Sequence, residues 1–199
     1  MALREEDIDG DPLRQFAAWL KDARAAEVRE PEAAALATAS AAGGPSVRMV
    51  LVKAFSEEGF VFFSNYSSRK ARELQGNPHA ALLFHWDPLG RQVRVEGPVE
   101  HTSAEETTAY VHTRPRASQL SALASPQSHT LASRAELERG VLELERRYAD
   151  RELPIPGDWG GFRIAIETVE LWQQRHDRLH DRLRYRRTGG SWTIERLAP

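Results

Sequence analysis

The first stretch of the chain with a clear apolar period lies near its N-terminus. Leu13, Phe16 and Leu20 recur at helical spacing behind an Asp-Pro pair, a combination that favours a helix start. We therefore expect an amphipathic leading helix within residues 11–30, preceded by a short arm at residues 1–10. The apolar stripe predicts that this helix packs against the rest of the chain.

The pattern then changes to short apolar segments separated by turn signals. Runs of this kind, bounded by Gly, Pro, Asn and Asp, are typical of β-strands in hairpin-like succession. The segments that fit are 33–40, 46–55, 59–65, 79–86, 91–102, 162–172 and 191–197. Roughly six or seven strands without β-α-β alternation predict an antiparallel barrel decorated by helices. The expected fold class is α+β, dominated by β-structure.

Capping signals place helices between the strands. The Ser-x-x-Glu signature of a capping box occurs at Ser103 and again at Ser133, which predicts helices over about 103–113 and 133–149. Between them, residues 114–130 form a turn-rich connection with room for one short helix.

The overall composition limits the possible functions. The 199 residues contain no flexible linker, so we expect a single domain over 1–199. A net charge of -2 argues against a protein that coats nucleic acid. Without cysteine there is no disulfide framework and no thiolate nucleophile. The acidic start without an apolar core and the lack of an apolar run of about 18 residues predict a cytoplasmic protein without a signal peptide.

Two cations occupy an unfavourable position in the segment that follows the third predicted strand. Ser67 and Ser68 are typical of a helix start, which places Arg69 and Lys70 in the first turn. A helix N-terminus carries about half a positive charge, so basic residues there are destabilising unless an anion is bound. Backbone N-H groups, hydroxyls and two cations together favour a phosphate site.

A second basic cluster runs from Arg175 to Arg187. If its latter half is extended, Arg178, His180 and Arg182 share one face, where they would suit an anionic partner; the alternative is a solvated edge strand. His176 and His180 also have the spacing of a zinc-binding helix. Because no third ligand is apparent, we predict no metal site.

Three further places could carry chemistry. Arg48 and Lys53 lie five residues apart in a predicted strand and would point to opposite faces of a regular strand. Residues 110–118 gather a phenol, an imidazole and two arginines as a phosphate clamp or as a polar helix end. Trp172 and Gln173 could bind a planar ring, although a core tryptophan is the commoner case.

Separate basic segments without a Walker loop, a GxSxG motif or paired carboxylates predict a protein that binds phosphorylated molecules and relies on a cofactor. At this point the chain resembles the pyridoxine (pyridoxamine) 5'-phosphate oxidases. The resemblance covers about residues 11–199. It is carried, in the family's order, by RMVLVK, FFSNYSSRKA, LLFHWDPLGRQVRVEG, YVHTRPRASQ, SPQS, WGGFRI, ELWQ, RLHDR and the terminal RLAP.

The resemblance implies an FMN-binding split β-barrel that forms a homodimer with two FMN sites at the subunit interface. It places the FMN contacts on Arg48, Met49, Val50, Leu51, Val52, Lys53, Phe63, Ser64, Arg69, Lys70, Gln92, Gln127, Ser128, Trp172 and Arg182. It places the substrate contacts on Lys53, Tyr110, Arg114, Ser118, Arg178, Leu179 and His180. Among these, Arg178 and His180 are the predicted catalytic residues.

The implied reaction oxidises pyridoxine 5'-phosphate or pyridoxamine 5'-phosphate to pyridoxal 5'-phosphate, with dioxygen as acceptor and hydrogen peroxide as product, in vitamin B6 synthesis and salvage. The amine also releases ammonia. His180 is a possible proton acceptor. The chain departs from many members in its short arm, which lacks much of a basic, tyrosine-containing stretch, and at Ser121, Leu123 and His129.

Two alternatives remain. One is a flavin oxidase of the phenazine-biosynthesis type, whose members tend to lose the lysine at Lys53 and the Arg-Pro-Arg clamp that this chain retains. The other is a non-catalytic carrier of flavin or pyridoxal phosphate. Retention of Arg178 and His180 argues against the carrier.

Overall fold

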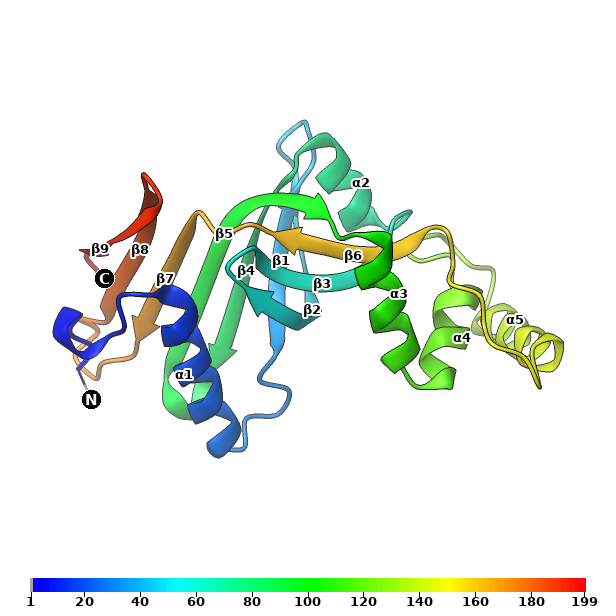
Figure 1. The fold of residues 1–199 in the computed structure, drawn as a ribbon, viewed down its shortest axis with the longest axis horizontal. Coiled ribbons are helices and arrows are strands. Elements are labelled where there is room, and N and C mark those ends of the chain that lie inside the picture. The colour runs from blue at the N-terminus through cyan, green and yellow to red at the C-terminus, as the bar shows by residue number, and fades with distance from the viewer. Residues whose placement is uncertain (1) are drawn as a thin grey trace.

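Six antiparallel strands close into a barrel in the computed structural model, which describes residues 2–199 (Figure 1). Around the barrel the order is β4, β1, β2, β3, β6, β5, and β5 pairs again with β4 to close the ring. Strands β7, β8 and β9 extend the sheet outward from β5. The strands are β1 Ala33–Ala39, β2 Pro45–Ser56, β3 Gly59–Asn65, β4 His79–Trp86, β5 Arg91–His101, β6 Trp159–Ile164, β7 Thr168–Gln173, β8 Asp181–Thr188 and β9 Ser191–Arg196.

Helices lie around this barrel. They are α1 Pro12–Ala25, α2 Arg69–Gly76, α3 Ala104–Thr113, α4 Arg116–Ala124 and α5 Arg134–Arg147, with single 3-10 turns at Glu5–Asp7 and Asp87–Leu89. The helices α3, α4 and α5 lie at the opposite end of the molecule from β7, β8 and β9 (Figure 1). No helix within residues 2–199 has both the length and the apolar character needed to cross a membrane.

Local signals predicted the helix starts well. Asp11 caps α1 by accepting a hydrogen bond from the Leu13 N-H. Ser103 and Glu106 form the complete reciprocal capping box at α3, and Ser133 caps α5. The connection predicted to hold one short helix contains α4.

The leading helix α1 packs its apolar stripe onto the barrel. The ring of Phe16, which is 1% exposed, lies 4.9 Å from the rings of Phe55, Phe60 and Phe84, measured between centroids. Trp19 is also buried, beneath the guanidinium of Arg91. Burial of several aromatic side chains at one place makes this contact a main source of stability.

The prediction of one strand over 162–172 was wrong, because this segment forms both β6 and β7. With β8, which the sequence pattern did not define, the sheet has nine strands rather than six or seven. On one side, β5 pairs first with β7 along Arg91–Glu96 and then with β6 along Val99–His101. The short connection between Ile164 and Thr168 therefore joins β6, which pairs with the end of β5, to β7, which pairs with the start of β5.

Gly97 permits this change of partner. Here the Ala165 N-H donates to the Pro98 carbonyl at 2.8 Å and the Glu167 N-H donates to the Glu96 carbonyl at 3.0 Å. A Cβ atom added at Gly97 would lie 1.8 Å from the Ala165 carbonyl oxygen. The backbones approach too closely for any side chain at this position.

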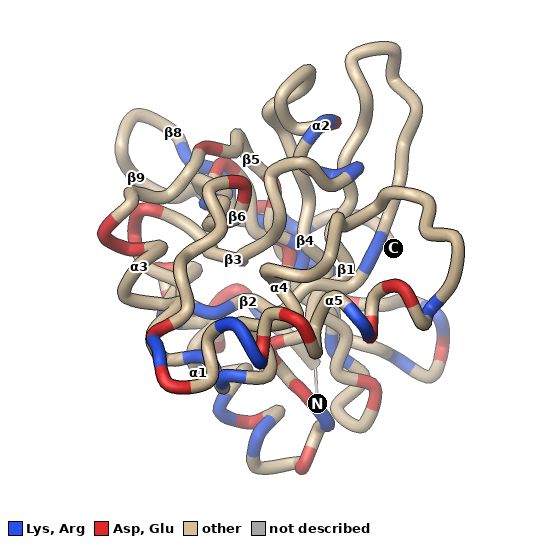
Figure 2. The backbone as a smooth tube through the Cα atoms, turned by 90° about the vertical axis from the view of Figure 1, so that its right-hand side faces the viewer, with Lys and Arg blue, Asp and Glu red and all other residues tan. Residues whose placement is uncertain are grey.

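Charged side chains are distributed over the whole chain. Basic and acidic residues are interspersed along the backbone in Figure 2, in keeping with the net charge of -2. The basic residues of the predicted sites are thus local groups on a mixed surface.

We predict that Gly97→Ala lowers the free energy of unfolding by at least about 2 kcal/mol, because the new methyl group overlaps a backbone carbonyl that cannot move independently. The matched control is Gly157→Ala, where an added Cβ has no atom within 4 Å. Urea denaturation should leave this control within about 0.5 kcal/mol of the wild type. Equal midpoints for the two variants would contradict the assigned role of Gly97.

Candidate functional site

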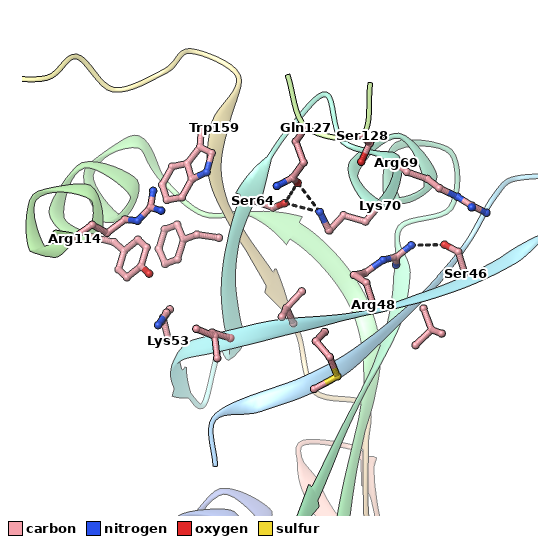
Figure 3. A pocket seen from close by; sticks show the side chains of 16 residues that line it. Ser46, Arg48, Lys53, Ser64, Arg69, Lys70, Arg114, Gln127, Ser128 and Trp159 are labelled. Carbon is pink, nitrogen blue, oxygen red and sulfur yellow. Dashed lines mark hydrogen bonds between the residues drawn. The ribbon is translucent and has the colours of Figure 1, made fainter. Parts of the chain in front are cut away.

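A cavity of about 640 Å³ lies between β2, β3, α2, α3 and the loop that follows α4 (Figure 3). Most of the predicted FMN and substrate contacts line it. These are Arg48, Met49, Val50, Leu51, Lys53, Phe63, Ser64, Arg69, Lys70, Tyr110, Arg114, Gln127 and Ser128. The two predicted contacts from this region that do not line it are Val52, which is buried in the core, and Ser118 on α4.

Lys70 is the most unusual charge in the cavity wall. It is 9% exposed, and its Nζ donates to Ser64 Oγ at 2.8 Å, to Ser68 Oγ at 3.2 Å and to Gln127 Oε1 at 2.8 Å. Figure 3 shows Ser64, Lys70 and Gln127 pointing toward one another. None of these oxygens carries a formal charge, and no carboxylate within residues 2–199 forms an ion pair with Lys70.

Burial, assisted by the positive charge of Arg48, lowers the pKa of Lys70 from 10.5 to about 8. A buried cation without a counter-ion is destabilised, and a bound anion would relieve this cost. The predicted position of Lys70 in the first turn of a helix is confirmed, since α2 begins at Arg69 and is capped by Ser68. The helix N-terminus adds to the positive potential at this place.

Glu73 connects two arginines of the cavity. Its Oε1 accepts from Arg69 Nε at 2.8 Å, and its Oε2 accepts from the hydroxyls of Thr38 and Ser46 at 2.5 Å each. Arg48 Nη2 lies 3.3 Å from the same Oε2. Burial alone would raise the pKa of Glu73, but the hydrogen bonds from Ser46, Thr38 and Arg69 outweigh it and lower the pKa to about 2. Glu73 is therefore ionised.

An aromatic wall faces this charged group across the cavity. The Phe63 and Tyr110 rings stack at 3.9 Å between centroids, and Trp159 stacks on Phe63 at 5.6 Å. The Arg114 guanidinium lies 4.7 Å from the centroid of Trp159. Burial raises the pKa of Tyr110, against the opposing charge of Arg114, so its phenol is a hydrogen-bond donor. A flat apolar wall with polar ends suits a planar ring.

Arg48 and Lys53 line the same cavity, although a regular strand would point them to opposite faces. The pairing of β2 with β3 shifts register between Val52 and Ala54. This bulge changes the direction of the side chains that follow it. The expectation of opposite faces was wrong because the strand is irregular here.

The remaining predicted residues form a separate group on the outer sheet. Gln92, Trp172 and Arg182 occupy one row across β5, β7 and β8, so their side chains share a face. His180 lies against Trp172, with 4.6 Å between the ring centroids. Trp172 is half-buried rather than part of the core. None of these four residues lines the cavity.

Buried Glu170 holds Arg182 in this row. Arg182 Nε and Nη2 donate to the two carboxylate oxygens of Glu170 at 2.7 and 3.1 Å. This hydrogen bonding raises the pKa of Arg182. The geometry is bidentate, which fixes the plane of the guanidinium.

Arg178, Leu179 and His180 lie in the turn before β8 and not in an extended strand. The expectation that Arg178, His180 and Arg182 alternate along one strand face was therefore wrong, since β8 begins at Asp181. Arg178 has a φ of 61°, and Ser128, which lines the cavity, has a φ of 70°. Non-glycine residues rarely adopt this left-handed conformation, and when they do they cluster at functional sites.

The turn also excludes the helical zinc motif. His176 and His180 share no helix, and no group of three metal-binding side chains occurs within residues 2–199. Instead, the Arg175 backbone N-H donates to His180 Nδ1 at 3.0 Å. The neutral imidazole consequently carries its proton on Nε2.

Four residues of the site were not predicted from the sequence. Ser46, Val47 and Trp159 line the cavity, and Glu73 organises its arginines. Only Glu73 had a usable local signal, because a glutamate four residues after Arg69 is the spacing of an intrahelical ion pair.

Comparison of this chain with known proteins identifies its family. Residues 20–148 match the family model described as pyridoxamine 5'-phosphate oxidase, and residues 159–199 match the pyridoxine 5'-phosphate oxidase C-terminal dimerisation region. The pyridoxine/pyridoxamine 5'-phosphate oxidase of Rubrobacter xylanophilus is 54% identical over 99% of this chain and 91% of its own length. The Salinibacter ruber enzyme of the same name is 52% identical over 99% of this chain and 93% of its own.

Solved structures agree in fold. PhzG from Burkholderia lata 383, in complex with tetrahydrophenazine-1-carboxylic acid, superposes with a TM-score of 0.93 at 32% identity, over 100% of this chain and 98% of its own. A pyridoxamine 5'-phosphate oxidase-related, FMN-binding protein from Nostoc punctiforme has a TM-score of 0.76 at 17% identity, over 96% of this chain and 100% of its own. The matches to the two family models and to these relatives show that this chain belongs to the pyridoxamine 5'-phosphate oxidase family.

Proposed function

We propose that this chain is an FMN-dependent oxidase that converts pyridoxine 5'-phosphate or pyridoxamine 5'-phosphate to pyridoxal 5'-phosphate. Dioxygen is the electron acceptor, hydrogen peroxide is the second product, and the amine also releases ammonia. The observation that carries this proposal is Lys70, a buried cation with three neutral oxygen partners at the start of α2. Such a group is suited to the phosphate of a bound nucleotide. We propose the cytoplasm as its location.

The residues of the cavity fit FMN. Arg48, Arg69 and Lys70 would hold the phosphate, while the exposed apolar side chains of β2, Met49 and Leu51, would lie along the flavin ring. When bound, FMN would supply the two-electron redox chemistry between the substrate and dioxygen. The protein contributes binding, orientation and electrostatics.

A second phosphate can be held at the other end of the cavity. Lys53, Tyr110 and Arg114 place an ammonium, a phenol and a guanidinium there, and we assign them, with Ser118 from α4, to the substrate phosphate. These groups are separate from Lys70, so each phosphate has its own cations. The distance between the two anchors then sets where the pyridine ring lies.

Arg178 and His180 would orient the substrate ring. The backbone N-H of Arg175 occupies His180 Nδ1, which leaves Nε2-H as a hydrogen-bond donor. We therefore propose His180 as a donor to the substrate rather than the proton acceptor considered from sequence. The contact with the Trp172 ring, tilted at 42° to the imidazole, restricts the rotation of the His180 ring.

The second group of residues does not line the cavity of its own chain. Gln92, Trp172, Arg178, His180 and Arg182 are separate from the cavity of their own chain, and we propose that in the homodimer they complete the partner's cavity. The match of residues 159–199 to a dimerisation region supports this arrangement, because most of the separate group lies in that segment.

A phenazine-type oxidase is the second candidate, because PhzG shares the fold at 32% identity. Retention of Lys53 and Arg114 in the cavity favours a substrate that carries a phosphate. The higher identity to pyridoxine/pyridoxamine 5'-phosphate oxidases, 54% and 52%, favours the same reading.

The direct test is turnover by the FMN-loaded protein. Pyridoxine 5'-phosphate should yield pyridoxal 5'-phosphate and one peroxide per aldehyde, whereas unphosphorylated pyridoxine should be a poor substrate. Preferential oxidation of a tetrahydrophenazine carboxylate would support the second candidate. Bound FMN with no oxidation of either compound would indicate a carrier.

The lowered pKa of Lys70 predicts a pH dependence of cofactor binding. Above about pH 8 the free protein loses the Lys70 proton, so FMN binding must take one up, and the Kd should rise by up to about tenfold per pH unit. Fluorescence titration of the apoprotein with FMN measures this. The rise of the Kd with pH should disappear in Lys70→Met. It should persist in Lys21→Met, a change on the exposed face of α1. A wild-type Kd that does not change with pH would contradict the role of Lys70.

We further predict that Arg178→Ala lowers kcat/KM for pyridoxine 5'-phosphate by about 100-fold, because substrate orientation is lost. Its FMN content should remain that of the wild type, measured by absorbance after gel filtration. Arg187→Ala, an exposed arginine of the same region, should change neither quantity. Equal loss of flavin and activity in Arg178→Ala would assign Arg178 to the cofactor instead.

A further inference from the structure

Glu73 lies next to the cavity, where its carboxylate contacts Arg48 and Arg69 of the cavity wall. The charged residues that line the cavity are all cations. Glu73 is 7% exposed and ionised, and it lies on the same helix as Arg69 and Lys70. A negative charge at this place repels a bound phosphate. We therefore expect this buried carboxylate to provide a benefit that offsets its repulsion of the anion.

The contacts of Arg48 indicate that role. Its Nη1 donates to the Leu36 carbonyl at 3.3 Å and to Thr38 Oγ1 at 2.5 Å, and its Nη2 donates to Ser46 Oγ and to Glu73 Oε2. These acceptors occupy the outer N-H groups and leave Nε-H for a ligand. The guanidinium is fixed before any anion arrives.

Glu73 also fixes the hydroxyls that hold Arg48. Thr38 and Ser46 each donate their proton to Glu73 Oε2, so their lone pairs face the arginine. The two hydroxyls thus accept from Arg48 while they donate to Glu73. On the other carboxylate oxygen, Arg69 is held through Nε, and its two Nη groups remain available.

We propose that Glu73 is a positioning residue that fixes Arg48 and Arg69 for the phosphate group of FMN. The inference rests on the proposed function and deepens it. Its charge also reduces the three cations of the site to a net charge of about two, which matches a phosphate dianion. Glu73 contacts the arginines and does not line the cavity, so its benefit lies in preorganisation.

The test compares the affinity of the apoprotein for FMN and for riboflavin, which lacks the phosphate. Glu73→Gln should weaken FMN binding by about 10- to 100-fold, the range found for residues that orient the ligands of a bound group. Riboflavin binding should stay within about twofold of the wild type. A purely structural defect would weaken both flavins equally. The opposite result, tighter FMN binding by Glu73→Gln, would show that repulsion outweighs positioning and would overturn the proposal.

Glu138→Gln is the matched control. Glu138 accepts from Arg134 Nε at 2.7 Å with the same four-residue spacing as Glu73 and Arg69, but it lies on α5, away from the cavity. Its FMN and riboflavin affinities should equal those of the wild type. Loss of FMN affinity in this variant would mean that a general change in charge, rather than positioning, is being measured.

A second pair of variants covers the case in which Glu73→Gln does not fold. Thr38→Val and Ser46→Ala each remove one hydroxyl that links Glu73 to Arg48 and leave the charge in place. Both should weaken FMN selectively, by a smaller factor. Unchanged FMN affinity in both variants would overturn the proposal. If the wild type itself bound riboflavin as tightly as FMN, the proposed phosphate site would fail first.

Discussion

The burial of the Lys70 ammonium at the start of α2 is the constraint on which the site depends. Its partners come from three separate places: Ser68 on its own helix, Ser64 on β3 and Gln127 in the loop after α4. Those contacts bring the loop against the barrel without supplying a negative charge. The buried cation is destabilised in the free protein, but the site is already formed when an anion binds.

Three arginines of the two residue groups are fixed in the same way. Glu73 holds Arg48 and Arg69 beside the cavity, and Glu170 holds Arg182 on the outer sheet. In both places a buried carboxylate uses some of the guanidinium N-H groups and so determines the direction of the rest. Long side chains that would otherwise be mobile become parts of a rigid surface, which lowers the entropic cost of binding.

Much of the fold followed from local patterns, and the failures occurred where distant segments meet. The hairpins of β1 to β5 and the capped helices depend on neighbouring residues, so their periodicity and caps predicted them. The division of 162–172 into β6 and β7 depends on the approach of Ala165 to Gly97, which no local pattern records. The turn at Arg178 is irregular, so an argument based on alternation could not place it.

The residues of the site could be predicted where they belong to the sequence motifs that carry the family resemblance. The resemblance supplied its residues, and the structure divided them into two groups, one around the cavity and one on the row of Gln92, Trp172 and Arg182. Glu73 was missed because its role requires β1 and β2 to bring Thr38 and Ser46 beside α2. Sequence spacing alone shows its contact with Arg69 and nothing of Arg48.

In the proposed homodimer, one working site combines the cavity of one chain with the outer-sheet residues of its partner, which are Gln92, Trp172, Arg178, His180 and Arg182. The most direct measurement is the activity of hybrid dimers, formed by refolding an equal mixture of an Arg69→Ala/Lys70→Ala chain and an Arg178→Ala chain, each inactive alone. Random pairing makes half the dimers hybrid, each with one intact site, so about a quarter of the wild-type activity should return. A mixture that stays as inactive as its two components would contradict the shared site.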